Sequence, residues 1–123
     1  MQSLRIEKIN RELLREISEL LRSRIKDPDA RRAVLTAVDC SRDISQAKVY
    51  FTTLDSEERE QVRRSLGKAA GILRSLLGKQ MRLRQIPRLM FMVDETEERA
   101  KSIDAILDRL RHEERPAENG ESQ

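Results

Sequence analysis

The hydrophobic positions in the first part of the chain predict a single long helix. From Leu4 to Lys26 the apolar residues recur at steps of three and four, as on one stripe of an α-helix; they are Ile6, Ile9, Leu13, Ile17, Leu20 and Leu21. The sequence Asp27-Pro28-Asp29 ends this helix, because the residue before a proline is pushed out of the α region. The chain therefore opens with an amphipathic helix.

Two short stretches that follow have the alternating, β-branched character of strands. In residues 33–40 the alternation places Val34, Thr36 and Val38 on one side. In residues 46–54 it places Ala47, Val49 and Phe51 on one side, and Lys48, Tyr50 and Thr52 on the other. Ser41-Arg42-Asp43 supplies turn residues between the two stretches. This pattern predicts a β-hairpin with one buried face.

The rest of the chain predicts a second helix, a third strand and a last helix. Asp55 or Ser56 can cap the second helix, which is expected to end near Gly78. Its core side carries Val62, Leu66, Ala69, Leu73, Leu76 and Leu77. The third strand covers Leu89 to Val93; Asp94 and Thr96 can cap a last helix whose apolar stripe is Ala100, Ile103, Leu107 and Leu110. This order predicts an α+β fold, with helices on one face of a three-stranded sheet.

Composition narrows the class of protein. The chain has 123 residues, of which 37% are hydrophobic and 38% charged, enough for one domain with one core. It has no run of about 18 apolar residues that would span a membrane and no apolar signal segment at its start. One cysteine, Cys40, and one histidine, His112, leave no disulfide framework and no tetrahedral metal set. We therefore expect a cytoplasmic protein without metal, cofactor or small-molecule substrate, in which Cys40 is a small buried hydrophobe.

Basic residues are concentrated in one segment. Residues 63–93 hold eight basic residues and no carboxylate, whereas residues 94–123 hold five basic and ten acidic residues. A segment without internal partners for its positive charges attracts a polyanion, which favours RNA or DNA binding. The alternative is a solvated basic face that is neutralised by the acidic ends of the chain folding over it.

The first helix offers a second basic strip. At about 100° per residue, five basic residues fall within a sector roughly 60° wide, opposite the apolar stripe. They are Lys8, Arg11, Arg15, Arg22 and Lys26. Their alignment suggests a further surface that faces an anion.

Gly71 lies inside the second helix, where glycine costs about 1 kcal/mol relative to alanine. Three explanations compete, namely close packing on the sheet, a kink, or a loop that contacts phosphate. The basic residues Lys68, Arg74 and Lys79 around this position favour a kink that opens a second helix start to an anion. Gly67 and Gly71 are four positions apart, one too many for the GXXG loop with which KH modules clamp single strands.

Several stretches together resemble bacterial ribosome-binding factor A, over roughly residues 4–110. They are Ala69-Ala70-Gly71, residues 73–79, Met81-Arg82-Leu83-Arg84, residues 87–91, Ala47-Lys48-Val49-Tyr50, the turn from Val38 to Asp43, the opening Arg5, Ile9 and Leu13, and Asp94. The resemblance implies a type II KH-like fold in which an Ala-x-Gly kink at Ala69, Ala70 and Gly71 replaces the GXXG loop. It also implies binding to immature 30S subunits, a role in 16S rRNA maturation near the 5′ end, and a role in growth at low temperature.

We expect a monomeric domain over residues 1–113 that binds 16S rRNA, and a disordered acidic tail over residues 114–123. The predicted RNA-binding residues are Lys68, Arg74, Lys79, Arg82, Arg84 and Arg88, with Lys8, Arg11 and Arg15 from the first helix. Tyr50, Phe51 and Phe91 are the only aromatic residues, and Phe51 and Phe91 are expected in the core. Recognition should therefore depend on phosphate position and RNA shape rather than on base stacking.

Three other classes of function stay open at this point. One is a general KH-like RNA-binding module that acts outside the ribosome, and another is a protein adaptor that uses the acidic last helix. The third is an enzyme, but Asp39 with Asp43 and Glu57 with Glu58 have plain explanations as turn and cap residues. The sequence holds no catalytic triad, Cys-His pair or metal set, so we expect no catalysis.

Overall fold

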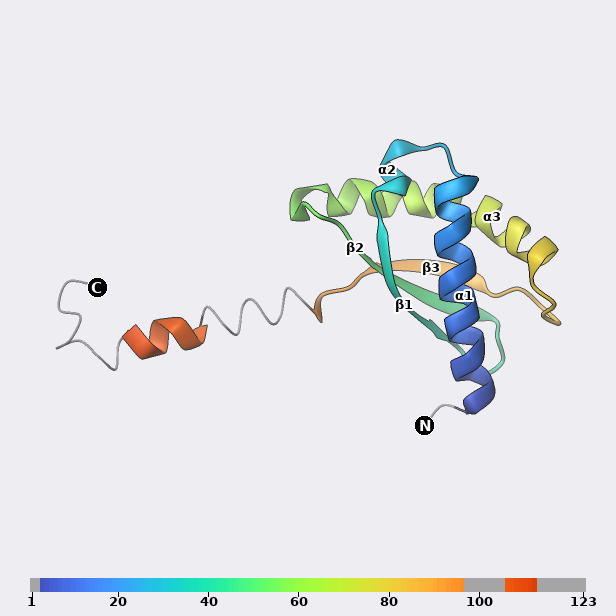
Figure 1. The fold of residues 1–123 in the computed structure, drawn as a ribbon, viewed down its shortest axis with the longest axis horizontal. Coiled ribbons are helices and arrows are strands. Elements are labelled where there is room, and N and C mark those ends of the chain that lie inside the picture. Colours follow the sequence, from blue (N-terminus) through green and yellow to red (C-terminus); the bar gives the residue numbers. More distant parts are fainter. Residues whose placement is uncertain (1–2, 97–105, 113–123) are drawn as a thin grey trace.

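The computed structural model describes residues 3–96 and 106–112. It contains the expected α+β arrangement, in which a three-stranded sheet packs against helices (Figure 1). The elements follow the order α1 (Leu4–Ser23), α2 (Pro28–Arg31), β1 (Val34–Cys40), β2 (Gln46–Thr52), η1 (Ser56–Glu58), α3 (Arg59–Gln80) and β3 (Arg88–Val93).

The first helix forms as predicted at its start and ends earlier than predicted. Ser3 caps α1, because its side chain accepts a hydrogen bond from the backbone N–H of Ile6 at 3.2 Å. All six residues of the predicted apolar stripe are buried. The helix ends at Ser23 rather than at Lys26, and the N–H of Arg24 donates to the carbonyl of Leu20.

The short helix α2 was not predicted. Asp27-Pro28-Asp29, interpreted from the sequence as a stop, also begins a new helix. The side chain of Asp27 accepts a hydrogen bond from the N–H of Asp29 at 3.0 Å, and Pro28 occupies the first helical position, where its missing N–H costs nothing. Ala30 is fully buried and fixes α2 to the core.

The hairpin forms, but the predicted facing of β1 is wrong in its first half. Strands β1 and β2 are antiparallel, and the register shifts between Leu35 and Ala37, so that Thr36 is an extra residue without a partner on β2. Leu35 lies opposite the buried Phe51, whereas Val34 lies opposite Thr52 and is 52% exposed. Val34 and Val38 therefore face opposite sides of the sheet. On β2 the predicted alternation is confirmed, because Ala47, Val49 and Phe51 are all fully buried.

The second predicted helix begins as η1 and continues as α3. The side chain of Asp55 accepts a hydrogen bond from the N–H of Glu57 at 3.0 Å, as expected of a cap. The predicted core side of α3 is confirmed, with Leu76 half-buried and the other five residues buried. The helix then leads to β3, which pairs in parallel with β2 and completes the order β1-β2-β3.

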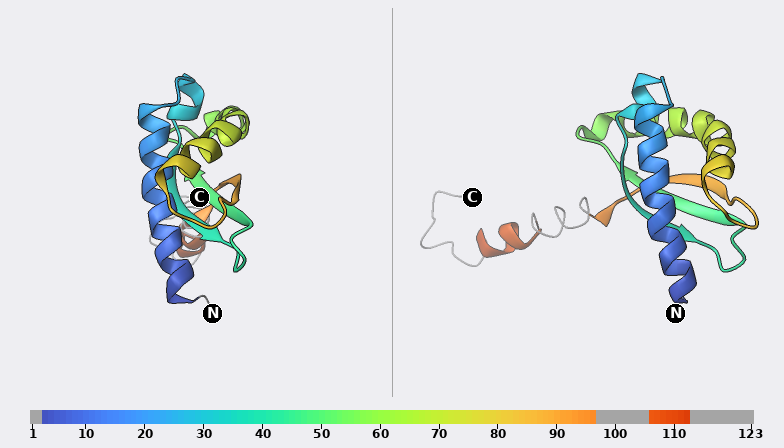
Figure 2. Two further views of the ribbon diagram at one scale, coloured as in Figure 1. Left: turned by 90° about the vertical axis from the view of Figure 1, so that its right-hand side faces the viewer. Right: turned by 45° about the vertical axis from the view of Figure 1, so that its right-hand side comes forward.

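A single core joins the two long helices to one face of the sheet. It includes Leu13 and Ile17 from α1, Val49 from β2 and Leu73 from α3, all fully buried. Figure 2 shows α1 and α3 crossing over this sheet from two further directions. Cys40 belongs to the same core, and its burial raises the pKa of its thiol. The interpretation of Cys40 as a buried hydrophobe is confirmed.

The C-terminal part is described only in two pieces. Asp94 accepts a hydrogen bond from the N–H of Thr96 at 2.9 Å, but residues 97–105, which the predicted last helix would include, lie outside the described residues, so its role as a helix cap stays a prediction. Residues 106–112 are helical, and Leu107 and Leu110 of the predicted stripe are exposed there. Ala100 and Ile103, the proposed boundary after residue 113 and the tail 114–123 lie outside the described residues.

Two features are absent from the described residues. None of their helices is long and apolar enough to cross a membrane. Among the same residues, no group of three or more histidine, cysteine, aspartate or glutamate side chains is placed to hold a metal ion.

Candidate nucleic-acid interface

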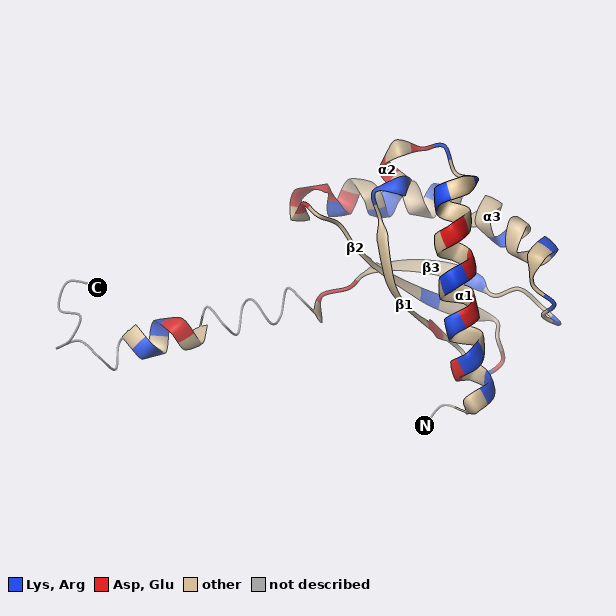
Figure 3. Cartoon of the chain, viewed as in Figure 1, with Lys and Arg blue, Asp and Glu red and all other residues tan. Residues whose placement is uncertain are grey.

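The structure brings six of the nine predicted RNA-binding residues to consecutive elements. Lys68, Arg74 and Lys79 lie on α3, Arg82 and Arg84 in the loop of residues 81–87, and Arg88 at the start of β3; all six are exposed. In Figure 3 the second half of α3 and this loop carry blue and no red. We call these six residues the α3–β3 basic surface.

The positive charges of this surface are not neutralised by described carboxylates. Among the described residues, the only ion pair from segment 63–93 joins Arg63 to Glu60, at 2.6 Å. None of the six residues of the α3–β3 basic surface forms one. Because no acidic side chain of the described residues pairs with these charges, their field extends into solvent.

Arg74 has a structural contact that the sequence did not predict. Its Nε and Nη2 atoms both donate to the carbonyl oxygen of Ile86, at 3.1 and 2.9 Å. This two-point contact ties the loop of residues 81–87 to α3. The acceptor is neutral, so Arg74 keeps its full positive charge while it holds the loop.

The loop is also fixed to the turn of the hairpin. Nε2 of Gln85 donates to the carbonyl oxygen of Asp43 at 2.7 Å, and the N–H of Arg88 donates to the carbonyl oxygen of Ser45 at 2.9 Å. These contacts and that of Arg74 hold the end of the loop that follows Arg82 and Arg84. The start of the loop is held by Met81, which is buried and whose N–H donates to the carbonyl oxygen of Leu77 at 2.8 Å. The basic loop is therefore positioned in advance of any ligand, which lowers the entropy lost on binding.

The turn to which the loop is attached is itself well defined. Oδ1 of Asp43 accepts hydrogen bonds from the hydroxyls of Ser45 and Ser41, at 2.7 and 2.8 Å, and from the N–H of Ser45 at 3.1 Å. These hydrogen bonds, led by that of the Ser45 hydroxyl, lower the pKa of Asp43, so the carboxylate stays charged well into acid. Ile44 adopts a φ of 61°, which is uncommon for a β-branched residue, and its side chain is buried.

Gly71 and Arg74 both line two open clefts. One, of about 440 Å³, is also lined by Ser75, Gly78, Gln85 and Ile86. The other, of about 450 Å³, is also lined by Gln46, Ala70, Arg88, Leu89 and Met90. A Cβ atom added to Gly71 would meet nothing within 4 Å, so close packing on the sheet does not explain this glycine.

The helix does not break at the position of the predicted kink. α3 is a single α-helix through Ala69, Ala70 and Gly71, so no second helix begins there and the expected anion site at such a start is not formed. The ribbon of α3 nevertheless changes direction about halfway along (Figures 1 and 2). Ala69 is buried and Ala70 half-buried, which leaves Gly71 alone of the three on the exposed side.

The three predicted residues on α1 lie in a different setting. Lys8 lies 3.9 Å from the carboxylate of Glu12, and Arg15 lies 3.4 Å from that of Glu16. Two of the three charges are therefore partly compensated on their own helix, while Arg11 is exposed and forms no ion pair with a described residue. Exposed pairs of this kind are weak and exchange readily with other partners.

The chain is similar to proteins of one family. A sequence model of the family described as ribosome-binding factor A matches residues 5–107. The ribosome-binding factor A of Thioalkalivibrio sulfidiphilus is 40% identical over 112 residues, which cover 90% of this chain and 87% of that protein. That of Ectopseudomonas mendocina is 39% identical over 120 residues, which cover 94% and 93%.

Solved structures of the same family share the fold. The crystal structure of ribosome-binding factor A from Thermus thermophilus matches with a TM-score of 0.63 and 27% identity, over 72% of this chain and 93% of that one. A homology model of the Thermus thermophilus protein, fitted into a cryo-EM map of a 30S complex, matches with a TM-score of 0.58 and 29% identity, over 69% and 90%. The α+β, type II KH-like fold is therefore confirmed, and this chain belongs to the ribosome-binding factor A family.

Proposed function

We propose that this protein binds immature 30S subunits in the cytoplasm and assists late maturation of 16S rRNA near its 5′ end. The role is that of an assembly factor rather than an enzyme. Membership of the ribosome-binding factor A family supports this proposal, as does the structural likeness to a relative fitted into a map of its 30S complex.

The observation that carries the proposal is the α3–β3 basic surface. Its six charges have no carboxylate partner among the described residues, and its loop is held by Arg74 and Gln85. A positive surface of fixed shape suits the phosphates of a folded RNA better than it suits a flexible single strand. The scarcity of exposed aromatic residues agrees with this, because Phe51 is fully buried and both Tyr50 and Phe91 are half-buried.

The proposal is tested by co-sedimentation of the full chain with immature and mature 30S subunits at two salt concentrations. We expect preferential binding to immature subunits that weakens steeply with salt. Arg82→Glu combined with Arg84→Glu should lower the slope of log affinity against log salt by roughly 1.5, because each lost phosphate contact removes about 0.7–0.9. Circular dichroism should show an intact fold, because both residues are exposed.

The matched control is Arg63→Glu combined with Arg111→Glu. These two arginines already pair with Glu60 and Asp108, and the double variant makes the same change in net charge. Unchanged binding of the Arg82 and Arg84 variant at low salt would remove the α3–β3 basic surface from the interface. Equal affinity for bulk RNA and for immature subunits would favour instead a general RNA-binding module that acts outside the ribosome.

A further inference from the structure

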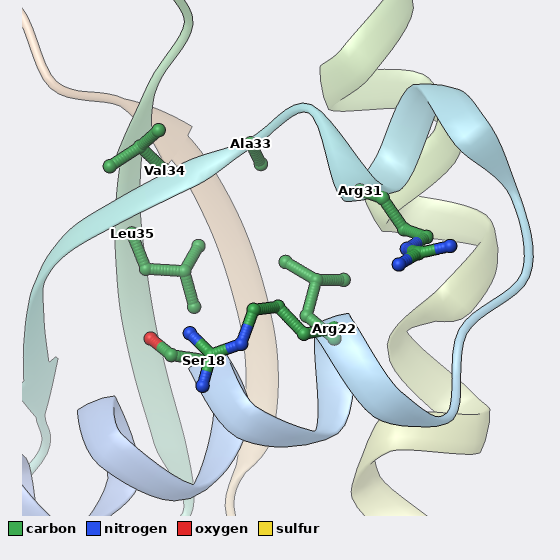
Figure 4. A pocket seen from close by; sticks show the side chains of 7 residues that line it. Ser18, Arg22, Arg31, Ala33, Val34 and Leu35 are labelled. Carbon is green, nitrogen blue, oxygen red and sulfur yellow. The ribbon is translucent and has the colours of Figure 1, made fainter.

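A third cleft, of about 380 Å³, lies where the C-terminal half of α1 meets α2 and the start of β1. We call it the α1–α2 cleft. Leu21, Ala33 and Leu35 give it an apolar lining, and Arg22 and Arg31 add a guanidinium group each from two different helices. Figure 4 shows the side chain of Arg22 extending toward Ser18 and Leu35, whereas the side chain of Arg31 extends from α2 in the opposite direction, at the other side of the cleft.

The two arginines of the α1–α2 cleft form no ion pair with a described residue. The nearby carboxylates are engaged elsewhere, because Asp29 and Glu58 both pair with Arg32. Asp29 also accepts a hydrogen bond from Gln61 at 2.8 Å. Neither Arg22 nor Arg31 therefore shares these two carboxylates.

The charge around this cleft extends beyond the two arginines. Arg24 and Lys26, in the segment between α1 and α2, are exposed and form no ion pair with the described part of the chain. Four basic side chains are thus clustered at the junction of two helices. The cluster contrasts with Lys8 and Arg15, earlier on α1, which pair with their neighbours.

The chemistry of the α1–α2 cleft fits a phosphodiester chain. Guanidinium groups present paired N–H donors that match the geometry of phosphate oxygens, and the hydroxyl of Ser18 adds a further donor. The apolar lining of the cleft strengthens the electric field of the two arginines. It can also contact the non-polar side of a ribose. An acidic protein segment would match the charge, but a series of basic residues spread over two helices suits the regular spacing of phosphates.

We propose that the α1–α2 cleft binds the phosphate backbone of a second stretch of rRNA, an inference that rests on the proposed function. The cleft is built from α1, α2 and β1, whereas the α3–β3 basic surface is built from α3, the following loop and β3. One chain then contacts two RNA segments at once. The second contact becomes intramolecular after the first, so each strengthens the other.

The test compares Arg22→Glu combined with Arg31→Glu, in the full chain, with the wild type and with the Arg63 and Arg111 control. Affinity for a protein-free 16S rRNA transcript and for immature 30S subunits is measured between low and moderate salt. The expected loss is roughly tenfold to twentyfold at about 0.15 M salt, with a slope lower by roughly 1.5. Arg22→Lys combined with Arg31→Lys keeps the charge and should retain most of the slope.

Each outcome separates this proposal from the broader one. If the Arg22 and Arg31 variant matches the control on both probes, the α1–α2 cleft does not bind RNA. If it loses affinity for subunits but not for the transcript, the cleft binds a ribosomal protein and the proposal is overturned. If it weakens both while the Arg82 and Arg84 variant weakens neither, the cleft stands as an RNA site and the α3–β3 basic surface fails.

Discussion

At the scale of single residues, Gly71, like Gly67, is a position at which the fold does not require glycine. Its backbone is helical and a side chain there would meet open space, so alanine should fit without strain. Glycine there costs the helix about 1 kcal/mol relative to alanine, and no close contact among the described residues requires it. We attribute the glycine to the clefts beside Arg74, where a side chain would stand between the protein and an RNA backbone.

Substitutions at Gly71 and, as a control on the same helix, at Gly67 test this role of the glycine. Gly71→Ala should raise the free energy of unfolding by about 0.5–1 kcal/mol, while it weakens binding to immature subunits severalfold. Gly67→Ala should give the same gain in stability without loss of binding, because Gly67 also faces open space but lines neither cleft. Urea unfolding and co-sedimentation measure the two effects. Equal binding by the two variants would mean that no ligand approaches Gly71.

At the scale of elements, the contact of Arg74 with Ile86 makes α3 and the basic loop one unit. Arg74→Lys keeps the charge but cannot reproduce the two-point contact with the carbonyl. We expect faster hydrogen exchange of the amides of residues 82–86 and weaker RNA binding with nearly unchanged salt dependence. Arg74→Gln should in addition lower the salt slope. If Arg74→Lys exchanges like the wild type, the loop is held by other contacts.

The elements also show where a local sequence pattern is sufficient to predict which residues are buried. The period of α1 and α3 and the alternation of β2 predicted their buried residues, because each repeats over many positions. The bulge at Thr36 breaks the period of β1, and its hydroxyl donates to Asp94 at 2.6 Å, a partner 58 residues away. Such a contact is set by the tertiary fold and leaves no signal in the neighbouring residues. The cap of α2, in contrast, has a local signal in Asp27-Pro28, although this pair was interpreted from the sequence only as a stop.

At the scale of the whole molecule, the sequence predicts which segments are basic or acidic, but not which charged side chains form ion pairs with each other. The absence of carboxylates from residues 63–93 ensures that the α3–β3 basic surface has no neutralising partner within its own segment. On α1 the regular spacing suggested one strip, whereas among the described residues Lys8 and Arg15 form ion pairs and Arg11 and Arg22 do not. Pairing depends on which side chains meet in space, so sequence spacing alone could not separate the paired residues from the unpaired ones.

The same distribution predicts how the whole molecule should respond to pH. Both proposed RNA surfaces rely on arginine and lysine, which stay charged, and the chain has a single histidine, His112. The thiol of Cys40 stays neutral because burial raises its pKa, and the lowered pKa of Asp43 keeps that carboxylate charged. Affinity for immature subunits should therefore vary less than about twofold from about pH 6 to pH 7.5, while it falls steeply with salt.

The control for this prediction is His112→Gln, measured by the same co-sedimentation at each pH. His112 lies in the helical residues 106–112, outside the residues that form either surface, so the variant should bind like the wild type at every pH. A decline of wild-type affinity with rising pH that disappears in His112→Gln would place the C-terminal helix at the RNA. Permanently charged groups that face phosphates give binding that depends strongly on salt and little on pH. Salt ions compete with these groups for the phosphates, whereas protons do not.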